Sequence, residues 1–360
     1  MNKTENLKMS SNIHSIMKKI MLLLMLSFLI ACAPAKEEKI KIGAILPLTG
    51  PFAFYGEDGR IAMELALEDV GNTTEIIYED SAGESPKAVT AFNKLTNVDG
   101  AKIVITSTSW ISNAVYSQAA DANIFQGIIA SAAFKRTRED KAVRFTVDVS
   151  DEAPYILDYL QTFNRIAIIH LDNDYGKGWA EALKKNLSDK VVAVEKYAPT
   201  DTDISAQLSK IKAGNPDVLV LASTAKEGGL FARKAKELGI EPQLVSMRPI
   251  QNPQLLQETK AVEGLVYSYP KYNANHAFVS RYVAKYGKEP TVFAVEAYDA
   301  IIEIAQAAEK CKSDAECMYQ SFMNKEYDGA LGHVKFDSKG DSHYPFVLKQ
   351  VKNGKFVSFQ

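Results

Sequence analysis

The sequence predicts an α/β protein in which parallel β-sheets, covered by helices on both faces, are divided between two lobes. Short apolar runs rich in Val and Ile alternate with helical patterns almost without a break, which is typical of parallel sheets. The alternation restarts from Asp151, so Asp148–Pro154 is a candidate crossing between lobes. A second candidate crossing is Pro270–Asn275. Because no low-complexity linker separates the two series, we expect short crossings.

The first series begins with a buried strand, Lys39–Leu46, that is followed by a helix over Gly56–Val70. Ile61 and Leu65 fall on one face of that helix, at helical spacing. The series continues with strand Thr74–Glu79, helix Pro86–Asn97, strand Ala101–Thr106, helix Ser112–Ala122 and strand Gly127–Ala130.

The second series follows the same alternation and ends differently. After a second crossing come two helices, Ala277–Tyr286 and the strongly apolar Val292–Ala308. Asn353-Gly354 then predicts a two-residue hairpin turn between strands Val347–Val351 and Lys355–Phe359, which we expect on one sheet edge. The elements before Pro270 are a helix from Asp151 to Gln161, strand Arg165–Leu171, helix Gly178–Leu187, strand Val191–Tyr197, helix Ile204–Ala213, strand Asp217–Ala222, helix Glu227–Leu238 and strands Gln243–Ser246 and Gly264–Ser268.

Residues 1–31 are predicted to be a lipoprotein signal peptide. Lys18-Lys19 precede an apolar run that fits a signal peptide and is shorter than the roughly 20 residues of a membrane-spanning helix. Leu29-Ile30-Ala31-Cys32 has the form of a bacterial lipoprotein cleavage site. We therefore expect Cys32 to carry lipid and to anchor the mature chain to a membrane, in the periplasm or at the cell surface. An ordinary signal peptide or a short anchor is the alternative.

Composition and charge exclude several other classes of protein. The chain carries −2, and removing the +3 of residues 1–31 (four Lys, one Glu) leaves −5. That mild acidity argues against nucleic-acid binding, which needs a concentrated basic surface. With 46% hydrophobic and 24% charged residues, the composition is that of a globular protein.

Two cysteines remain besides Cys32. Cys311 and Cys317 lie six residues apart in a polar segment, and outside the cytoplasm this spacing predicts a local disulfide. Two free thiols are the alternative. Because no His or Cys lies nearby to complete a ligand set, we expect no metal site there.

The motifs of common enzymes are missing. The five His show no HExxH spacing, and the sequence contains neither GxSxG nor GxxxxGK[ST]. Gly50–Gly59 follows the first strand, but its glycine spacing does not fit a dinucleotide site. Asp80, Asp172 and Asp174 follow strands, where such residues commonly cap the next helix. We expect no enzyme activity and no cofactor.

Six segments together carry a family likeness. They are Ile42–Pro51 with Tyr55-Gly56-Glu57, Tyr78–Ser81, Asp174–Gly178, Asp201–Ile204, Asn215–Asp217, and Tyr327–Asp337 with Gly340. In this order they resemble the type I periplasmic solute-binding proteins of the branched-chain amino-acid (leucine/isoleucine/valine) type. The likeness extends from Lys39 to Phe359.

The resemblance implies two lobes joined by three crossing segments, with a ligand cleft between them. Residues 32–149 and 271–330 would form lobe I, and residues 150–270 and 331–360 would form lobe II. It also implies a monomer that delivers a small solute to an ABC permease with its ATPase. A module that presents the bound solute to a membrane sensor is the alternative, because one fold serves both roles.

The resemblance further indicates where the solute would bind in lobe I. In amino-acid-binding relatives a Ser after the third strand holds the ligand carboxylate with nearby backbone N–H groups, and Ser109 occupies that place. A hydroxyl at a helix N-terminus suits an anion; a plain helix cap is the alternative. The next strand of those relatives ends in Ala-Ala-Thr. Here Ala132 is kept, but Phe134 replaces the Thr and adds a ring.

In lobe II the resemblance places Arg248 where those relatives have the acid that binds the ligand ammonium. An ammonium about 4 Å from a guanidinium, at an effective dielectric near 20, would face roughly 4 kcal/mol of repulsion. We therefore expect a carboxylate-bearing solute, which Arg248 would pair with through its planar fork. A surface pair with Asp or Glu is the alternative for Arg248.

Four further residues complete the predicted site. Tyr55 and Tyr175 match positions that line the cleft in the family, and Thr224 follows a lobe II strand as a polar contact. Trp110 follows Ser109 and adds an aromatic wall, unless it covers a hinge. Together these residues imply a carboxylate with an apolar or aromatic body.

Overall fold

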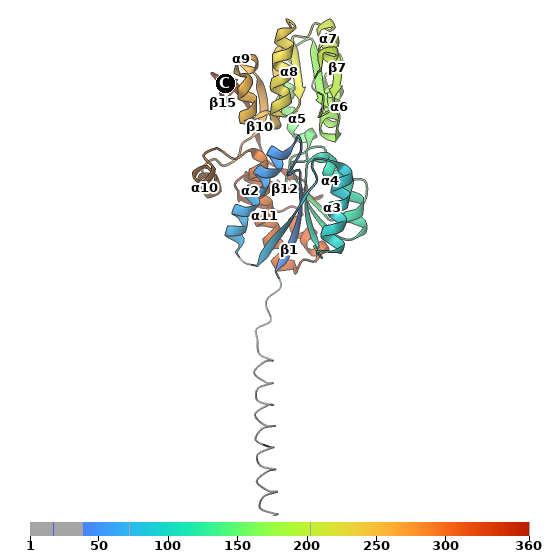
Figure 1. Ribbon diagram of the computed structural model, residues 1–360, viewed down its shortest axis with the longest axis vertical. Coiled ribbons are helices and arrows are strands. Elements are labelled where there is room, and N and C mark those ends of the chain that lie inside the picture. The colour runs from blue at the N-terminus through green and yellow to red at the C-terminus, as the bar shows by residue number, and fades with distance from the viewer. Residues whose placement is uncertain (1–16, 18–38, 72, 202, 360) are drawn as a thin grey trace, which may run out of the picture. The chain divides into compact units, whose positions relative to one another are not determined.

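Two α/β lobes, each built on its own sheet, make up the described part of the chain (Figure 1). The computed structural model describes residues 17, 39–71, 73–201 and 203–359. Apart from Met17, the predicted signal peptide lies outside these residues, as does Cys32. Within the described ranges no helix has both the length and the apolar character needed to cross a membrane. The predicted fold class is confirmed.

Lobe I is the five-stranded sheet with its helices. All its strands are parallel, in the order β2-β1-β3-β4-β5. The interior strand β1 reads IKIGAIL and is buried from Ile42 onward, as expected for a strand covered on both faces. The strands are β1 (Ile40–Leu46), β2 (Thr74–Asp80), β3 (Ile103–Ser107), β4 (Phe125–Ile129) and β5 (Ala142–Arg144), and the helices are α2 (Ala53–Val70), α3 (Ser85–Asn97), α4 (Ser109–Asp121), α10 (Ala277–Tyr286), α11 (Val292–Cys311) and α12 (Ala315–Phe322).

Lobe II is the seven-stranded sheet with its helices. Its order is β15-β14-β10-β9-β8-β6-β7, and only β14 and β15 run antiparallel to their neighbours. The strands are β6 (Ile166–Leu171), β7 (Val191–Tyr197), β8 (Val218–Ala222), β9 (Gln243–Ser246), β10 (Val266–Pro270), β14 (Phe346–Lys352) and β15 (Lys355–Ser358), and the helices are α5 (Val149–Leu160), α6 (Asp174–Leu187), α7 (Ser205–Ala213), α8 (Ala225–Glu237), α9 (Thr259–Val262) and the 3-10 helices η1 (Arg248–Ile250) and η2 (Pro253–Glu258).

The chain passes between the lobes after β5, after β10 and before β14. Just before the last passage it forms a small antiparallel sheet in the order β11-β12-β13, which contacts lobe I through the Arg144 N–H and the Gly340 carbonyl, 2.8 Å apart. The assignment of residues to lobes given above stays a prediction. The three strands are β11 (Glu326–Gly329), β12 (Gly332–Phe336) and β13 (Ser342–His343).

The predicted hairpin at the end of the chain is confirmed. β14 and β15 pair antiparallel around Asn353 and Gly354, whose φ angles are +53° and +67°. Two positive φ values identify the type I′ turn that Asn-Gly favours. The hairpin lies on the edge of the lobe II sheet, where β14 pairs with β10.

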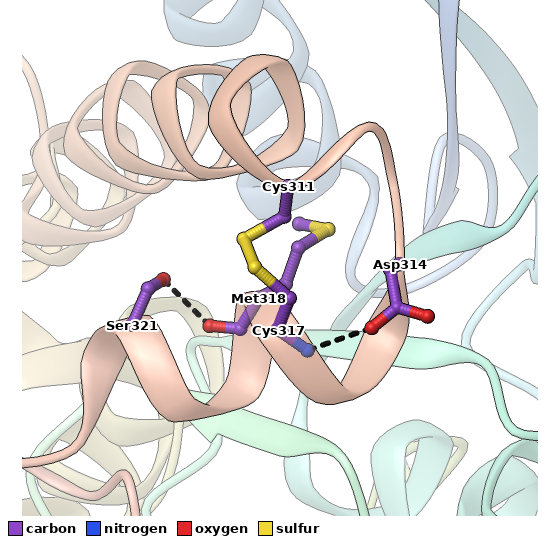
Figure 2. Close-up of a disulfide and its surroundings, with 5 residues drawn as sticks. All are labelled: Cys311, Asp314, Cys317, Met318 and Ser321. Atoms are coloured by element: carbon purple, nitrogen blue, oxygen red, sulfur yellow. Dashed lines mark hydrogen bonds between the residues drawn. A yellow bond between two sulfur atoms is a disulfide. The ribbon is translucent and has the colours of Figure 1, made fainter.

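Cys311 and Cys317 are joined by a disulfide at the end of α11 (Figure 2). The bond connects the last residue of α11 to the first turn of α12. Asp314 caps α12, because its Oδ1 accepts a hydrogen bond from the Cys317 N–H at 2.8 Å. The disulfide and the cap therefore fix the same short connection between two helices of lobe I.

Candidate functional site

The candidate site is a cavity between the two lobes, with about 520 Å³ of unfilled space when the open solvent at its mouth is included. Several of its residues follow the carboxyl ends of strands, where open α/β sheets bind ligands. The lining residues are Phe52, Tyr55, Thr108, Trp110, Ala130, Ala132, Thr146 and Phe293 from lobe I, and Leu171, Tyr175, Thr224, Arg248 and Pro249 from lobe II.

Six of the eight residues predicted as ligand contacts line this cavity: Tyr55, Trp110, Ala132, Tyr175, Thr224 and Arg248. Ser109 and Phe134 are not among its lining residues. Whether any of the eight contacts a solute stays a prediction.

Two Tyr-Gly pairs position an aromatic ring at the cavity from each lobe. A Cβ on Gly56 would lie 2.1 Å from the Pro47 carbonyl oxygen, and one on Gly176 would lie 2.0 Å from the Leu171 carbonyl oxygen. Only glycine allows each helix to begin so close to the end of the preceding strand. Tyr55 and Tyr175, one residue earlier, are thereby placed at the cavity.

Tyr55 connects the lobes directly. From α2 in lobe I, its hydroxyl donates to the Pro249 carbonyl at 3.0 Å and accepts from the Ala225 N–H at 3.4 Å. Burial raises the pKa of Tyr55, so the phenol stays protonated. A second contact between lobes joins Asn113 Nδ2 to Asp174 Oδ2 at 2.9 Å. The cavity is therefore enclosed by contacts from both lobes.

Trp110 forms part of the aromatic wall. Its ring centroid lies 4.8 Å from that of Phe52, and its Nε1–H donates to the Gly83 carbonyl at 2.9 Å. With the indole N–H engaged, the ring offers an apolar surface to the cavity.

Ser109 and Phe134 are both engaged within lobe I. The Ser109 hydroxyl accepts a hydrogen bond from the Ala133 N–H at 3.1 Å. Phe134 is 6% exposed and packs edge-on against Tyr116, with ring centroids 5.1 Å apart. Both side chains thus have partners within the protein, and neither lines the cavity.

Arg248 lines the cavity, but its charged partners are buried carboxylates that do not line it. Its side chain is 1% exposed and contacts Glu152 at 2.5 Å and Glu296 at 3.2 Å. Its Nη2 also donates to the Val147 carbonyl at 2.8 Å. The expected alternative of a surface ion pair is wrong, because both carboxylates are fully buried. The repulsion predicted above, between a ligand ammonium and Arg248, treated the guanidinium as an isolated charge. In the structure, the two carboxylates offset that charge.

Burial and charge oppose each other in this cluster. Burial alone would lower the pKa of Arg248, but Glu152, Tyr344 and Glu296 raise it above its ordinary value. Burial raises the pKa of Glu152, although Arg248 and Ser268 act in the opposite direction. Arg248 is thus a cation held by its neighbours and not a free charge at the cavity wall.

Sequence reasoning missed Thr108 and Ala130, which line the cavity at the ends of β3 and β4. Their φ angles are +74° and +51°, a strained region for residues other than glycine. Neither residue type indicates such a backbone.

Sequence reasoning also missed Glu296, although the sequence pattern could have indicated it. Glu296, Asp299 and Glu303 lie at helical spacing on the apolar face of α11, where charged residues are unexpected.

In the part of the chain that the structure describes, no group of three or more His, Cys, Asp or Glu side chains is arranged to hold a metal ion. The pocket residues instead supply hydroxyls, backbone amides and aromatic rings. Such a site can bind and enclose a small molecule.

Comparisons with known proteins match this geometry. Residues 39–355 match the family described as periplasmic binding protein. A leucine-, isoleucine-, valine-, threonine- and alanine-binding protein of Pseudomonas aeruginosa is 26% identical over 329 residues, 84% of this chain and 87% of that protein.

Two solved structures share the fold. An extracellular ligand binding receptor from Desulfohalobium retbaense is 36% identical with a TM-score of 0.87; the match covers 89% of this chain and 60% of that chain. A solute binding protein of an ABC transporter from R. palustris, in complex with benzoate, is 19% identical with a TM-score of 0.81, and the match covers 89% of this chain and 96% of that one. The latter likeness concerns the fold alone.

Proposed function

We propose, from the premise that this chain belongs to the periplasmic binding protein family, that it captures a small carboxylate-bearing solute between its lobes for an ABC importer. Its relatives are binding proteins, and it is not an enzyme. The solute would be an amino-acid-like compound or an aromatic or branched acid. One named relative is a leucine-, isoleucine-, valine-, threonine- and alanine-binding protein, and the aromatic wall of the cavity suits an aromatic body.

The observation that carries this proposal is the cavity between the lobes. Tyr55 and the Asn113–Asp174 pair join the lobes beside it, so a bound solute would be enclosed on both sides. Hinged closure of two lobes around a ligand buries the ligand almost completely.

The first turn of α4 supports a carboxylate. Thr108, the residue before this helix, makes no side-chain capping bond, and the first N–H groups of a helix have no partner within it. Helix N-termini with free N–H groups favour anions. Thr108 and Trp110 line the cavity, which brings this helix end to the solute.

We further propose that Cys32 carries lipid after removal of residues 1–31. This would anchor the protein to a membrane in the periplasm or at the cell surface, beside a permease and its ATPase. The sequence before Cys32 supports this, and mass spectrometry of the protein from its native envelope would test it. An unmodified Cys32 thiol would contradict the proposal.

Thermal-shift screening tests solute capture. A solute that binds only the folded protein, present at a hundred times its Kd, stabilises it by about 2.7 kcal/mol, which we expect to raise the Tm by about 5 °C. Small-angle X-ray scattering should then report a smaller radius of gyration with solute than without it. A panel of amino acids, aromatic acids and dicarboxylates that leaves both readouts unchanged would refute the proposal.

A further inference from the structure

Glu296 contacts the lining residues Ala130, Thr146 and Arg248, and its carboxylate has no lone pair left for a ligand. Its Oε1 accepts from Arg248 Nη1 at 3.2 Å and from the Tyr344 hydroxyl at 2.8 Å. Its Oε2 accepts from the Ala130 N–H at 2.8 Å and the Thr146 hydroxyl at 2.6 Å. An ionised carboxylate offers about four acceptor positions, and four donors occupy them.

The second carboxylate, Glu152, lies behind Arg248. It is fully buried, contacts Arg248 through Oε2 and accepts from the Ser268 hydroxyl through Oε1 at 2.7 Å. Arg248 lines the cavity and Glu152 does not. Of the three charged side chains in this cluster, only that of Arg248 lines the cavity, so neither carboxylate is available to a solute.

Backbone acceptors at the wall are engaged as well. The Ala132 carbonyl accepts from the Val149 N–H at 3.0 Å, and the Thr224 carbonyl accepts from the Gly228 N–H at 2.9 Å. The Pro249 carbonyl accepts from the Tyr55 hydroxyl. The acceptors that remain among the described lining residues are neutral: carbonyls such as those of Ala130 and Thr146, and the hydroxyls of Thr108 and Tyr175.

Donors, by contrast, are free. The Thr108 hydroxyl is buried and has no partner among the described residues, and the residue is 7% exposed. Thr108 lines the cavity directly before α4, so its hydroxyl and the first N–H groups of the helix lie together. Its φ of +74° is strain of the kind found at ligand-binding positions.

From this excess of donors over charged acceptors we propose that the solute is an organic acid without an ammonium group, and that Thr108 contributes to holding its carboxylate. The inference rests on the proposed function and decides between the two solute classes left open there. An α-amino acid would bury its ammonium with no carboxylate among the lining residues to receive it.

An unpaired buried charge costs several times more than an unpaired neutral group. We therefore expect discrimination of at least about a hundredfold in Kd between an acid and its amino derivative. Isothermal titration calorimetry on the protein with two pairs of probes measures this: 4-methylpentanoate against leucine, and 3-phenylpropanoate against phenylalanine.

Tighter binding of the acid in either pair by that factor supports the inference, provided that the other pair does not favour the amino acid. An amino acid that binds as tightly as its acid, or more tightly, overturns the inference and leaves the proposed function intact. If neither pair and no other solute of a broad panel binds, both the inference and the proposed function fail.

Variants of Thr108 give a second readout. We expect Thr108→Val to weaken binding of the preferred acid about tenfold, the loss of one hydrogen bond to a charged group, and Thr108→Ser to restore it. Thr74→Val is the matched control, since Thr74 also has a buried, unpartnered hydroxyl and lies at the start of β2, outside the cavity lining. Equal affinities for Thr108→Val and the unmodified protein would overturn the role of Thr108.

Discussion

At the residue scale, buried charge is concentrated where Arg248 lies between Glu152 and Glu296. The three side chains come from η1, α5 and α11, so one guanidinium joins elements of both lobes. Replacing one member of a buried ion pair usually costs more than the pair itself contributes, because the remaining charge is left without a partner.

We expect Arg248→Ala to lower the free energy of unfolding by about 3–5 kcal/mol, because two buried carboxylates lose their cation. Urea unfolding at neutral pH measures this change. Arg233→Ala is the matched control: Arg233 also contacts two carboxylates, Glu237 and Glu258, but its side chain is 43% exposed. Similar losses in both variants would contradict the explanation.

Asp299 predicts a pH dependence of stability. Its Oδ1 accepts from the Ala330 N–H at 2.9 Å and its Oδ2 from the Leu331 N–H at 2.8 Å, and burial raises its pKa to about 7. Between the ordinary pKa of an unfolded Asp, about 4, and this value, the folded protein holds a proton that the unfolded chain has released. The contribution of Asp299 to stability therefore falls as pH rises from about 4 to about 7.

Asp299→Asn should remove this contribution, which amounts to at most about 1.4 kcal/mol per pH unit. Urea unfolding of both proteins between pH 4 and pH 8 gives the difference. The control is Asp328→Asn, which changes an exposed carboxylate of the β11–β12 hairpin, whose turn contains Ala330 and Leu331. A difference between Asp299→Asn and the unmodified protein that stays constant across this range would exclude the mechanism.

Residue positions could be predicted where a local motif determines them, and side-chain partners could not. Tyr55 and Tyr175 lie at the cavity because each precedes a glycine on which its helix start depends. The Ser109 hydroxyl is engaged by the Ala133 N–H, and the charge of Arg248 at the cavity wall is offset in part by Glu296. Both partners come from other elements, so nothing in the neighbouring sequence indicates them.

At the element scale, helices α4 and α6 approach each other across the lobes. In the same region, Gly178 allows α6 to pack against the segment that follows β4, since a Cβ there would lie 2.9 Å from the Ala133 Cβ. A real Cβ contact is longer, so a side chain at this position would separate the lobes locally.

We expect Gly178→Ala to weaken solute binding about tenfold, because overpacking at the closed interface costs roughly 1–3 kcal/mol. The Tm of the solute-free protein should not fall, since Ala favours a helix by about 1 kcal/mol over Gly. Calorimetric titration and thermal unfolding measure the two effects. Gly59→Ala in α2 is the control, because its Cβ would meet Ala297 at an ordinary 3.8 Å. Unchanged affinity in Gly178→Ala would contradict the prediction.

Elements with a strong apolar period were predictable, and short or polar ones were not. β1, β7 and α10 begin and end within a residue of the expected positions. β5 has three residues, and β11 alternates half-buried and exposed positions without an apolar run. Such strands form because a partner strand supplies hydrogen bonds, which a local pattern does not reveal.

At the scale of the whole molecule, closure depends on direct bonds between the lobes, among them Asn113–Asp174 and Arg248–Glu296. The Tyr55 hydroxyl makes two of them, to Pro249 and Ala225. Both partners belong to lobe II, and the side chain projects from lobe I. Opening of the lobes would have to break both bonds.

Tyr55→Phe should therefore shift the solute-free protein toward an open form and weaken solute binding by about tenfold, since each hydrogen bond contributes about 1 kcal/mol. Scattering should report a larger radius of gyration for the variant. In Tyr298→Phe, the control, the lost bond runs to Asp69 within lobe I, and neither readout should move. A variant that scatters and binds like the unmodified protein would show that Tyr55 does not control closure.

The two-lobed architecture followed from the restart of the strand–helix alternation near Asp151, and the sheets confirm it. The path of the chain near its end was harder to predict. The segment from Tyr327 to Asp337 forms β11 and β12 beside lobe I before the chain enters β14. Its placement depends on buried contacts with Asp299, not on its own composition.

The chain contains two tryptophans, and their surroundings differ. Trp110 forms part of the cavity wall, whereas Trp179 is completely enclosed in the core of lobe II. When a solute binds, the fluorescence of Trp110 should therefore change in emission wavelength or intensity. The emission of Trp179 should stay constant and provides an internal reference. The native polypeptide thus supplies an optical reporter of occupancy without any attached dye.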